Sequence, residues 1–124
     1  MRGSSARLVL DTSAVAAYGR GSIHVGETIG EIADEGAAFA VPTICLAEAV
    51  MDAKPEELTL IDVLAGHPSC REIPLTDDWR NLGLGARVYG SLSRAHVRAV
   101  AIERHAYILT ADPEAYGDLP TVGI

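Results

Sequence analysis

The chain has few aromatic residues, a single lysine and no long apolar run. Aromatic residues make up 5% of the 124 residues, which argues against a stacking platform for single-stranded bases. No apolar stretch is long enough to span a bilayer, so no membrane association is expected. The hydrophobic fraction is 48% and the mean hydropathy is +0.18, so we expect a packed aliphatic core. The length predicts one domain over residues 1–124.

The sequence also lacks the usual signatures of a zinc site or a secreted protein. Cys45 and Cys70 have no metal-ligand spacing, and both lie in apolar segments that favour small buried hydrophobic residues. The four histidines have no zinc spacing either. Residues 1–5 are polar and lack the apolar centre of a signal peptide, so we expect a cytoplasmic protein.

The net charge of −7 argues against general nucleic-acid binding through a basic surface. It does not exclude a nuclease that holds phosphate through metal ions and a few local arginines. Arg94 and Arg98 are one helical turn apart and would share a face. The alternative is an ordinary solvated face with Glu103 nearby.

Short apolar runs alternate with helical patterns along the whole chain. Ser13 is predicted to cap the first helix and Ser93 to begin the last long one. The pattern predicts right-handed βαβ units and a mainly parallel sheet of four to five strands, covered on both sides. The predicted strands are 7–10, 37–41, 70–75, 107–109 and a short 122–124, and the predicted helices are 14–18, 24–35, 43–51, 55–65, 76–89 and 93–104.

Three acids stand at places where such a fold would gather them. Asp11 and Asp112 each follow a predicted strand, and functional crevices lie at the carboxyl ends of parallel strands. Glu48 is the only charged residue of segment 43–51, which predicts a helix buried on all sides. Carboxylates are the hard oxygen ligands that Mg²⁺ and Mn²⁺ prefer. The side chains expected to orient these acids are Thr12, Ser13 and Thr110.

Each acid also has an ordinary structural interpretation. Asp11 could cap the following helix, although Ser13 could do so equally well and leave Asp11 available. Asp112 could act as a cap in the same way, beside Pro113. Glu48 could point to water from a helix that is only half-buried. Competing chemistries fit worse, because the chain has no glycine-rich phosphate loop and no nucleophile elbow.

Residues 8–14 (LVLDTSA), 42–48 (PTICLAE) and 108–116 (ILTADPEAY) resemble the motifs of the PIN domain family in order and spacing. The small size is similar to the VapC-type toxins of bacterial VapBC toxin–antitoxin pairs. This resemblance implies a three-layer α/β/α fold, RNA cleavage that depends on Mg²⁺ or Mn²⁺, a homodimer and an antitoxin partner. It also implies that Asp11, Glu48 and Asp112 are catalytic metal ligands supported by Thr12 and Thr110.

One expected acid is absent. The family usually has another Asp where this chain reads SRAHV at 93–97, and Arg94 falls closest to that position. His96 is either the nearest substitute ligand or a histidine at the edge of the core, and Glu114 is another candidate. An arginine there would repel a metal ion and attract phosphate. Two hypotheses follow: a metal-dependent endoribonuclease, or a PIN-like module that binds RNA or a protein partner without cleavage.

Overall fold

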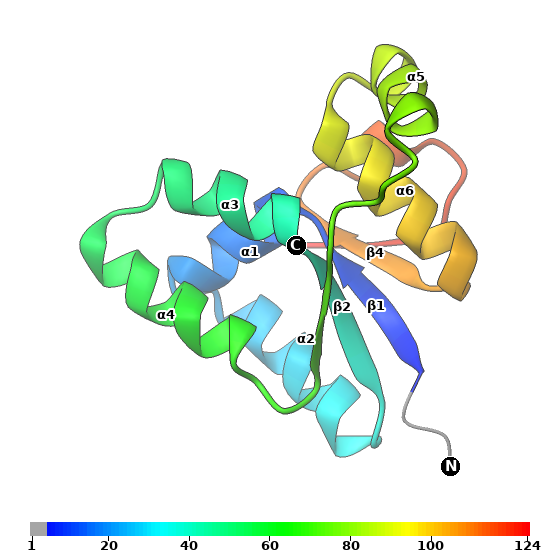
Figure 1. The fold of residues 1–124 in the computed structure, drawn as a ribbon. Helices are drawn as coiled ribbons and strands as arrows, with labels where there is room; N and C mark the ends of the chain where they lie inside the picture. Colours follow the sequence, from blue (N-terminus) through cyan, green and yellow to red (C-terminus); the bar gives the residue numbers. More distant parts are fainter. Residues whose placement is uncertain (1–4) are drawn as a thin grey trace.

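The computed structural model describes residues 5–124, so the opening residues 1–4, part of the segment considered above for a signal peptide, lie outside it. Its five strands form one sheet in the order β3-β2-β1-β4-β5, and every neighbouring pair is parallel. Figure 1 shows β2, β1 and β4 side by side. The predicted parallel sheet is therefore confirmed, including its short fifth strand. The strands are β1 (Ala6–Leu10), β2 (Ala38–Pro42), β3 (Cys70–Ile73), β4 (Tyr107–Thr110) and β5 (Thr121–Gly123).

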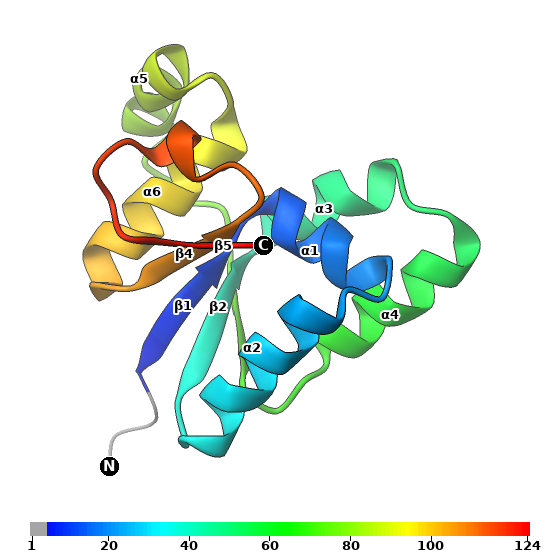
Figure 2. The same ribbon diagram turned by 180° about the vertical axis from the view of Figure 1, so that it is seen from behind.

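Six α-helices cover the two faces of this sheet. The first four lie on one side and the last two on the other, which makes three layers (Figures 1 and 2). This arrangement follows from right-handed crossovers. The chain moves in one direction along the sheet from β1 to β3 and then returns to β4 on the other side of β1, so the later helices cover the opposite face. The helices are α1 (Thr12–Gly19), α2 (Ile23–Asp34), α3 (Thr43–Met51), α4 (Pro55–Ala65), α5 (Trp79–Tyr89) and α6 (Leu92–Arg104), with a 3₁₀ turn η1 (Pro113–Tyr116) before β5.

The core lies on both faces of the central strands β1 and β2. Val9, Leu10 and Phe39 are fully buried there, which explains why these strands read as continuous apolar runs rather than alternating ones. Burying one such side chain stabilises the fold by about 1.5–3 kcal/mol. Rigid central strands of this kind give the residues at their carboxyl ends a fixed framework.

Three of the predicted helix starts are wrong. Helix α1 begins after Asp11, whose Oδ1 accepts a hydrogen bond from the backbone N–H of Ala14 at 3.0 Å, so Asp11 and not Ser13 is the cap. Helix α6 begins after Ser91, two residues before Ser93. Helix α5 begins at Trp79 and not at residue 76, because Asp78 takes the capping position. In the first case the chain turns directly after Leu10, and the first side chain past the strand takes the capping position. Asp11 Oδ1 therefore has the helix-capping role that the sequence analysis gave as the alternative to metal binding.

The prediction that segment 43–51 is buried on all sides is also wrong. In α3 only Cys45 and Ala49 are buried, whereas Met51 is 80% exposed. The helix packs against α1 and β2 along one side, and its apolar composition does not require a second covering layer. Glu48 is half-buried, as the alternative interpretation of this residue anticipated.

The cysteines meet their prediction in part. Cys45 is buried, and burial raises the pKa of its thiol to about 12. Cys70 is only half-buried, because it begins the edge strand β3. None of the helices among residues 5–124 is both long and apolar enough to cross a membrane.

Candidate active site

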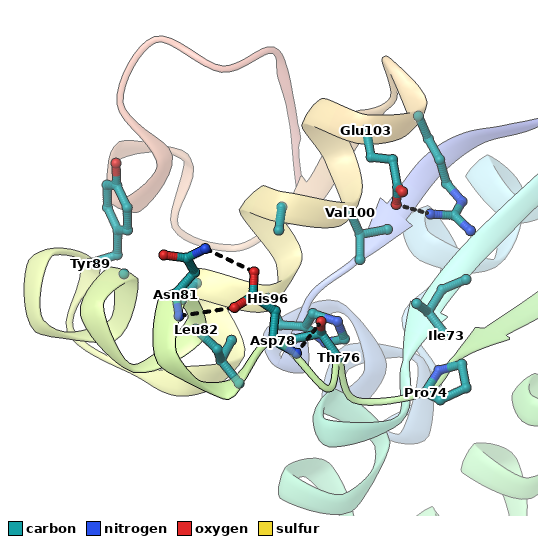
Figure 3. A pocket seen from close by; sticks show the side chains of 14 residues that line it. Ile73, Pro74, Thr76, Asp78, Asn81, Leu82, Tyr89, His96, Val100 and Glu103 are labelled. Carbon is teal, nitrogen blue, oxygen red and sulfur yellow. Dashed lines mark hydrogen bonds and ion pairs between the residues drawn. The ribbon is translucent and has the colours of Figure 1, made fainter.

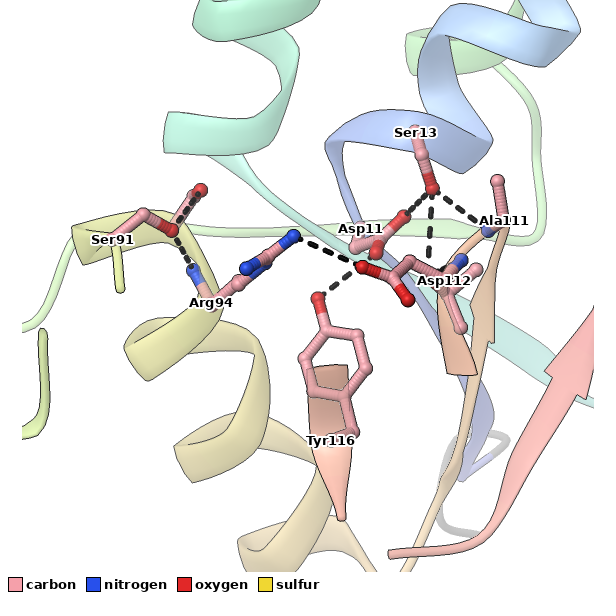
Figure 4. Close-up of polar contacts among 9 residues, drawn as sticks. Asp11, Ser13, Ser91, Arg94, Ala111, Asp112 and Tyr116 are labelled. Atoms are coloured by element: carbon pink, nitrogen blue, oxygen red, sulfur yellow. Dashed lines mark hydrogen bonds and ion pairs between the residues drawn. The ribbon is translucent and has the colours of Figure 1, made fainter. Parts of the chain in front are cut away.

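A cavity of about 460 Å³ opens at the carboxyl ends of β1 and β4. All three predicted acids line it, together with the start of α6. Figure 4 shows two of the acids, Asp11 and Asp112, with Arg94. The structure therefore brings these remote acids to one crevice at the carboxyl ends of the strands. The lining residues, named here as the acid cavity, are Asp11, Thr12, Ser13, Ala16, Glu48, Gly90, Ser91, Ser93, Arg94, Asp112 and Tyr116.

Asp11 is a buried carboxylate with both oxygens engaged. Its Oδ1 accepts hydrogen bonds from Ser13 Oγ at 2.6 Å and from Ala14 N, and its Oδ2 accepts one from the Tyr116 hydroxyl at 2.9 Å (Figure 4). Burial raises the pKa of the Tyr116 phenol, and the adjacent Asp11 carboxylate raises it further. Tyr116 therefore stays a protonated donor that holds Asp11 in place. Sequence reasoning assigned no role to Tyr116, although it closes the last motif.

Glu48 reaches the acid cavity from α3. Thr12 Oγ1 donates a hydrogen bond to Glu48 Oε1 at 2.7 Å, joining the first turn of α1 to α3. This contact matches the orienting role predicted for Thr12. The same position places Cys45 beside Thr12 and near both Asp11 and Glu48, where its thiol remains neutral.

Asp112 pairs with Arg94, the residue closest to the position where the sequence resemblance led us to expect another acid. Arg94 Nη2 lies 3.2 Å from Asp112 Oδ2, and the two side chains are 42% and 55% exposed. The backbone N–H of Asp112 donates to Thr110 Oγ1 at 2.9 Å, and Thr110 itself is fully buried. Thr110 therefore fixes the backbone at Asp112, while Arg94 neutralises its carboxylate.

Ser13 links the ends of two adjacent strands. Its Oγ donates to Asp11 Oδ1 and accepts a hydrogen bond from the backbone N–H of Ala111 at 2.9 Å. The Oγ also lies 3.5 Å from Thr110 Oγ1. Because Asp11 follows β1 and Ala111 follows β4, this one hydroxyl holds the two strand ends in register.

Neither candidate for a substitute ligand lies in the acid cavity. His96 is 3% exposed and lines a second cavity of about 500 Å³ between the segment after β3, α5 and α6 (Figure 3). Residues two apart on a helix point about 200° apart, so His96 and Arg94 occupy opposite flanks of α6. Burial lowers the pKa of His96, and its Nδ1 has no hydrogen-bond partner within residues 5–124. Glu114 is exposed on η1 and does not line the cavity.

The arrangement does not fit a divalent metal ion. Within residues 5–124, no three His, Cys, Asp or Glu side chains converge closely enough to hold one ion. The donor chemistry is suitable, because Asp11, Glu48 and Asp112 are all carboxylates. Their positions are not, since Asp11 is held by its hydrogen bonds and Asp112 by the Arg94 guanidinium.

A five-stranded parallel sheet between two helical layers, with acids at the strand ends, defines a three-layer α/β/α fold of the PIN-like class. The structure is similar to a chain in the crystal structure of VapBC2 from Rickettsia felis bound to a DNA fragment from their promoter. The TM-score is 0.64, and the match covers 94% of this chain and 98% of that chain. At 17% sequence identity, this likeness establishes the fold alone. No protein-family model and no curated protein matches the sequence.

Proposed function

We propose that this chain is a VapC-like module that binds a basic segment of a partner protein in its acid cavity, without metal-dependent RNA cleavage. One observation carries the proposal: the cavity holds three carboxylates and one guanidinium, in an arrangement that does not fit a metal ion. Two of these negative charges therefore have no cationic partner among residues 5–124. Such a cavity attracts cationic side chains and repels the phosphates of RNA.

The type of partner follows from charge and from the structural neighbour. The whole chain carries a net charge of −7, which favours a basic partner. The neighbour is a VapBC assembly, and an antitoxin-type protein is the partner that we propose for this chain. A space of about 460 Å³ is large enough for one or two arginine or lysine side chains of such a partner.

The binding half of the proposal can be tested with a fluorescent peptide of alternating arginine and serine residues. Fluorescence anisotropy should show saturable binding to the wild-type protein. Glu48→Gln should weaken it roughly threefold to tenfold, because one partly desolvated charge pair is lost. The matched control is Glu31→Gln, which removes the same charge from an exposed site on α2. Equal losses in the two variants would refute a role for the acid cavity.

The second half is tested by incubating purified protein with single-stranded and hairpin RNA in Mn²⁺ or Mg²⁺. We expect no more cleavage than with Asp112→Asn. Asp112 is suited to this comparison because its side chain is exposed and the substitution leaves the core untouched.

A metal-dependent endoribonuclease is the second candidate, and one observation favours it. The acids at all three motif positions, Asp11, Glu48 and Asp112, line the same cavity. RNA cleavage by the wild-type protein that disappears in Asp112→Asn would support this candidate and refute the absence of cleavage proposed above. The homodimer stays a prediction, which light scattering of the purified protein would test.

A further inference from the structure

Arg94 enters the acid cavity from the first turn of α6. Its backbone N–H donates to Ser91 Oγ at 3.0 Å, which fixes the start of the helix. Its side chain then reaches Asp112 Oδ2, as Figure 4 shows. Among the lining residues in the described part of the chain, 5–124, the guanidinium is the only cationic group. It pairs with one of the three carboxylates that line the cavity.

The three carboxylates are not equally available to an ion. Asp11 accepts three hydrogen bonds, and Asp112 is ion-paired. Glu48 accepts one hydrogen bond, from the neutral hydroxyl of Thr12. A divalent ion bound by Glu48 and Asp112 would have to displace the Arg94 guanidinium from Asp112. The two cations would then lie close together. Two like charges a few ångströms apart repel strongly in a partly desolvated site.

We infer that Arg94 is the resident cation of the acid cavity: it neutralises Asp112 and keeps a divalent metal ion out. Removing this guanidinium frees the Asp112 carboxylate, and Asp112 and Glu48 then bind Mn²⁺. The inference rests on the proposed function in one respect, since both take the wild-type cavity to hold no metal ion.

The exposure of this ion pair makes the inference testable without loss of the fold. Arg94 and Asp112 are 42% and 55% exposed, so neither side chain supports the packed core. Replacement of Arg94 by a neutral residue changes the charge of the cavity without creating an internal void. Arg94→Gln retains much of the side chain, and Arg94→Asp adds a fourth carboxylate.

The experiment measures Mn²⁺ binding by calorimetry and by electron paramagnetic resonance, with no substrate present. Wild-type protein should bind weakly, on the order of 1 mM. Arg94→Gln should bind Mn²⁺ at least roughly tenfold more tightly, and Arg94→Asp more tightly still, because each substitution makes the net charge of the cavity more negative. Arg94→Lys keeps the positive charge and should stay close to the wild type. Arg87→Gln removes the same charge from an exposed position on α5 and should also show no gain.

Three results would overturn the inference. The first is wild-type binding as tight as that of Arg94→Gln, and the second is an equal gain in Arg87→Gln. The third is a gain in Arg94→Gln that survives the addition of Asp112→Asn. Circular dichroism checks the fold of each variant, and Arg94→Ala replaces Arg94→Gln if the latter does not fold. A gain in Mn²⁺ affinity is independent of peptide binding, so this inference and the proposed function can fail separately.

Discussion

Tyr116 donates a hydrogen bond from its phenol to Oδ2 of Asp11 at 2.9 Å, across a sequence separation of 105 residues. The bond joins η1 to the end of β1 inside the core, where Tyr116 is 1% exposed. With Ser13 and Ala14 on the other oxygen, it gives the Asp11 carboxylate a complete set of protein partners. Asp11 is therefore a fixed structural element of the acid cavity.

Tyr116→Phe removes this bond and leaves the ring in place. We expect a loss of about 2 kcal/mol in the free energy of unfolding, because the acceptor is an ionised and buried carboxylate. Urea denaturation at neutral pH measures the change. Tyr107→Phe is the matched control, since Tyr107 is 53% exposed and its hydroxyl makes no recorded hydrogen bond within residues 5–124. Equal stability of the two variants would mean that the Tyr116 hydroxyl contributes nothing to the fold.

Ser13→Ala tests the link between the ends of β1 and β4. The substitution deletes one hydrogen bond to Asp11 and one from the backbone of Ala111. We expect the free energy of unfolding to fall by about 1–2 kcal/mol, since the buried carboxylate loses a donor. Thermal denaturation compares this variant with Ser5→Ala, whose side chain is exposed. If the two variants unfold at the same temperature, the Ser13 hydrogen bonds contribute nothing to the stability of the fold.

The meeting of the three acids could be predicted from the sequence, and the reason is geometric. Parallel strands place their carboxyl ends at one edge of the sheet, so Asp11 and Asp112 had to lie along the same edge. The pairing of β1 with β4 in the structure makes them neighbours. Glu48 follows the same logic through the short connection from β2 to α3. These relationships depend on backbone topology, which apolar periodicity reveals.

The partners of those acids could not be predicted in the same way. Whether the Arg94 side chain reaches Asp112 depends on how α6 is placed over the sheet, and no sequence period encodes that placement. The Tyr116 bond likewise depends on the turn η1, whose path is irregular. His96 is a different case, because its spacing of two residues from Arg94 already indicated opposite flanks of the helix.

His96 should make stability depend on pH. Burial lowers its pKa below the usual 6.5, with the charge of Glu103 acting in the opposite direction. The unfolded chain therefore takes up a proton near pH 6.5 that the folded protein resists. Stability should hold its full value above that pH and decline as the pH falls toward the lowered pKa. The loss between pH 7.5 and 5.5, followed by denaturant titration, should be smaller in His96→Gln than in the wild type. A loss of the same size in the two proteins would contradict this role of His96.

Arg94 and Arg98 share a helix flank but should differ in their effect on stability. Arg98 lies over the Tyr89 ring at 4.1 Å and donates to the Tyr116 carbonyl at 3.2 Å. Arg94 makes one exposed ion pair, which is worth less than about 1 kcal/mol. We expect Arg98→Ala to cost about 1–2 kcal/mol more than Arg94→Ala in urea denaturation. A larger loss in Arg94→Ala would contradict this assignment.

The capping role of Asp11 affects how inactivating substitutions should be interpreted. An amide at this position would weaken the hold on Tyr116 and on the first turn of α1, so a fraction of the molecules would unfold. Cells degrade such molecules, and a modest destabilisation lowers abundance severalfold. A genetic screen would therefore score Asp11 as essential even if the protein carried out no chemistry. Asp112, whose side chain lies at the surface, is the position where phenotype and protein level can be separated.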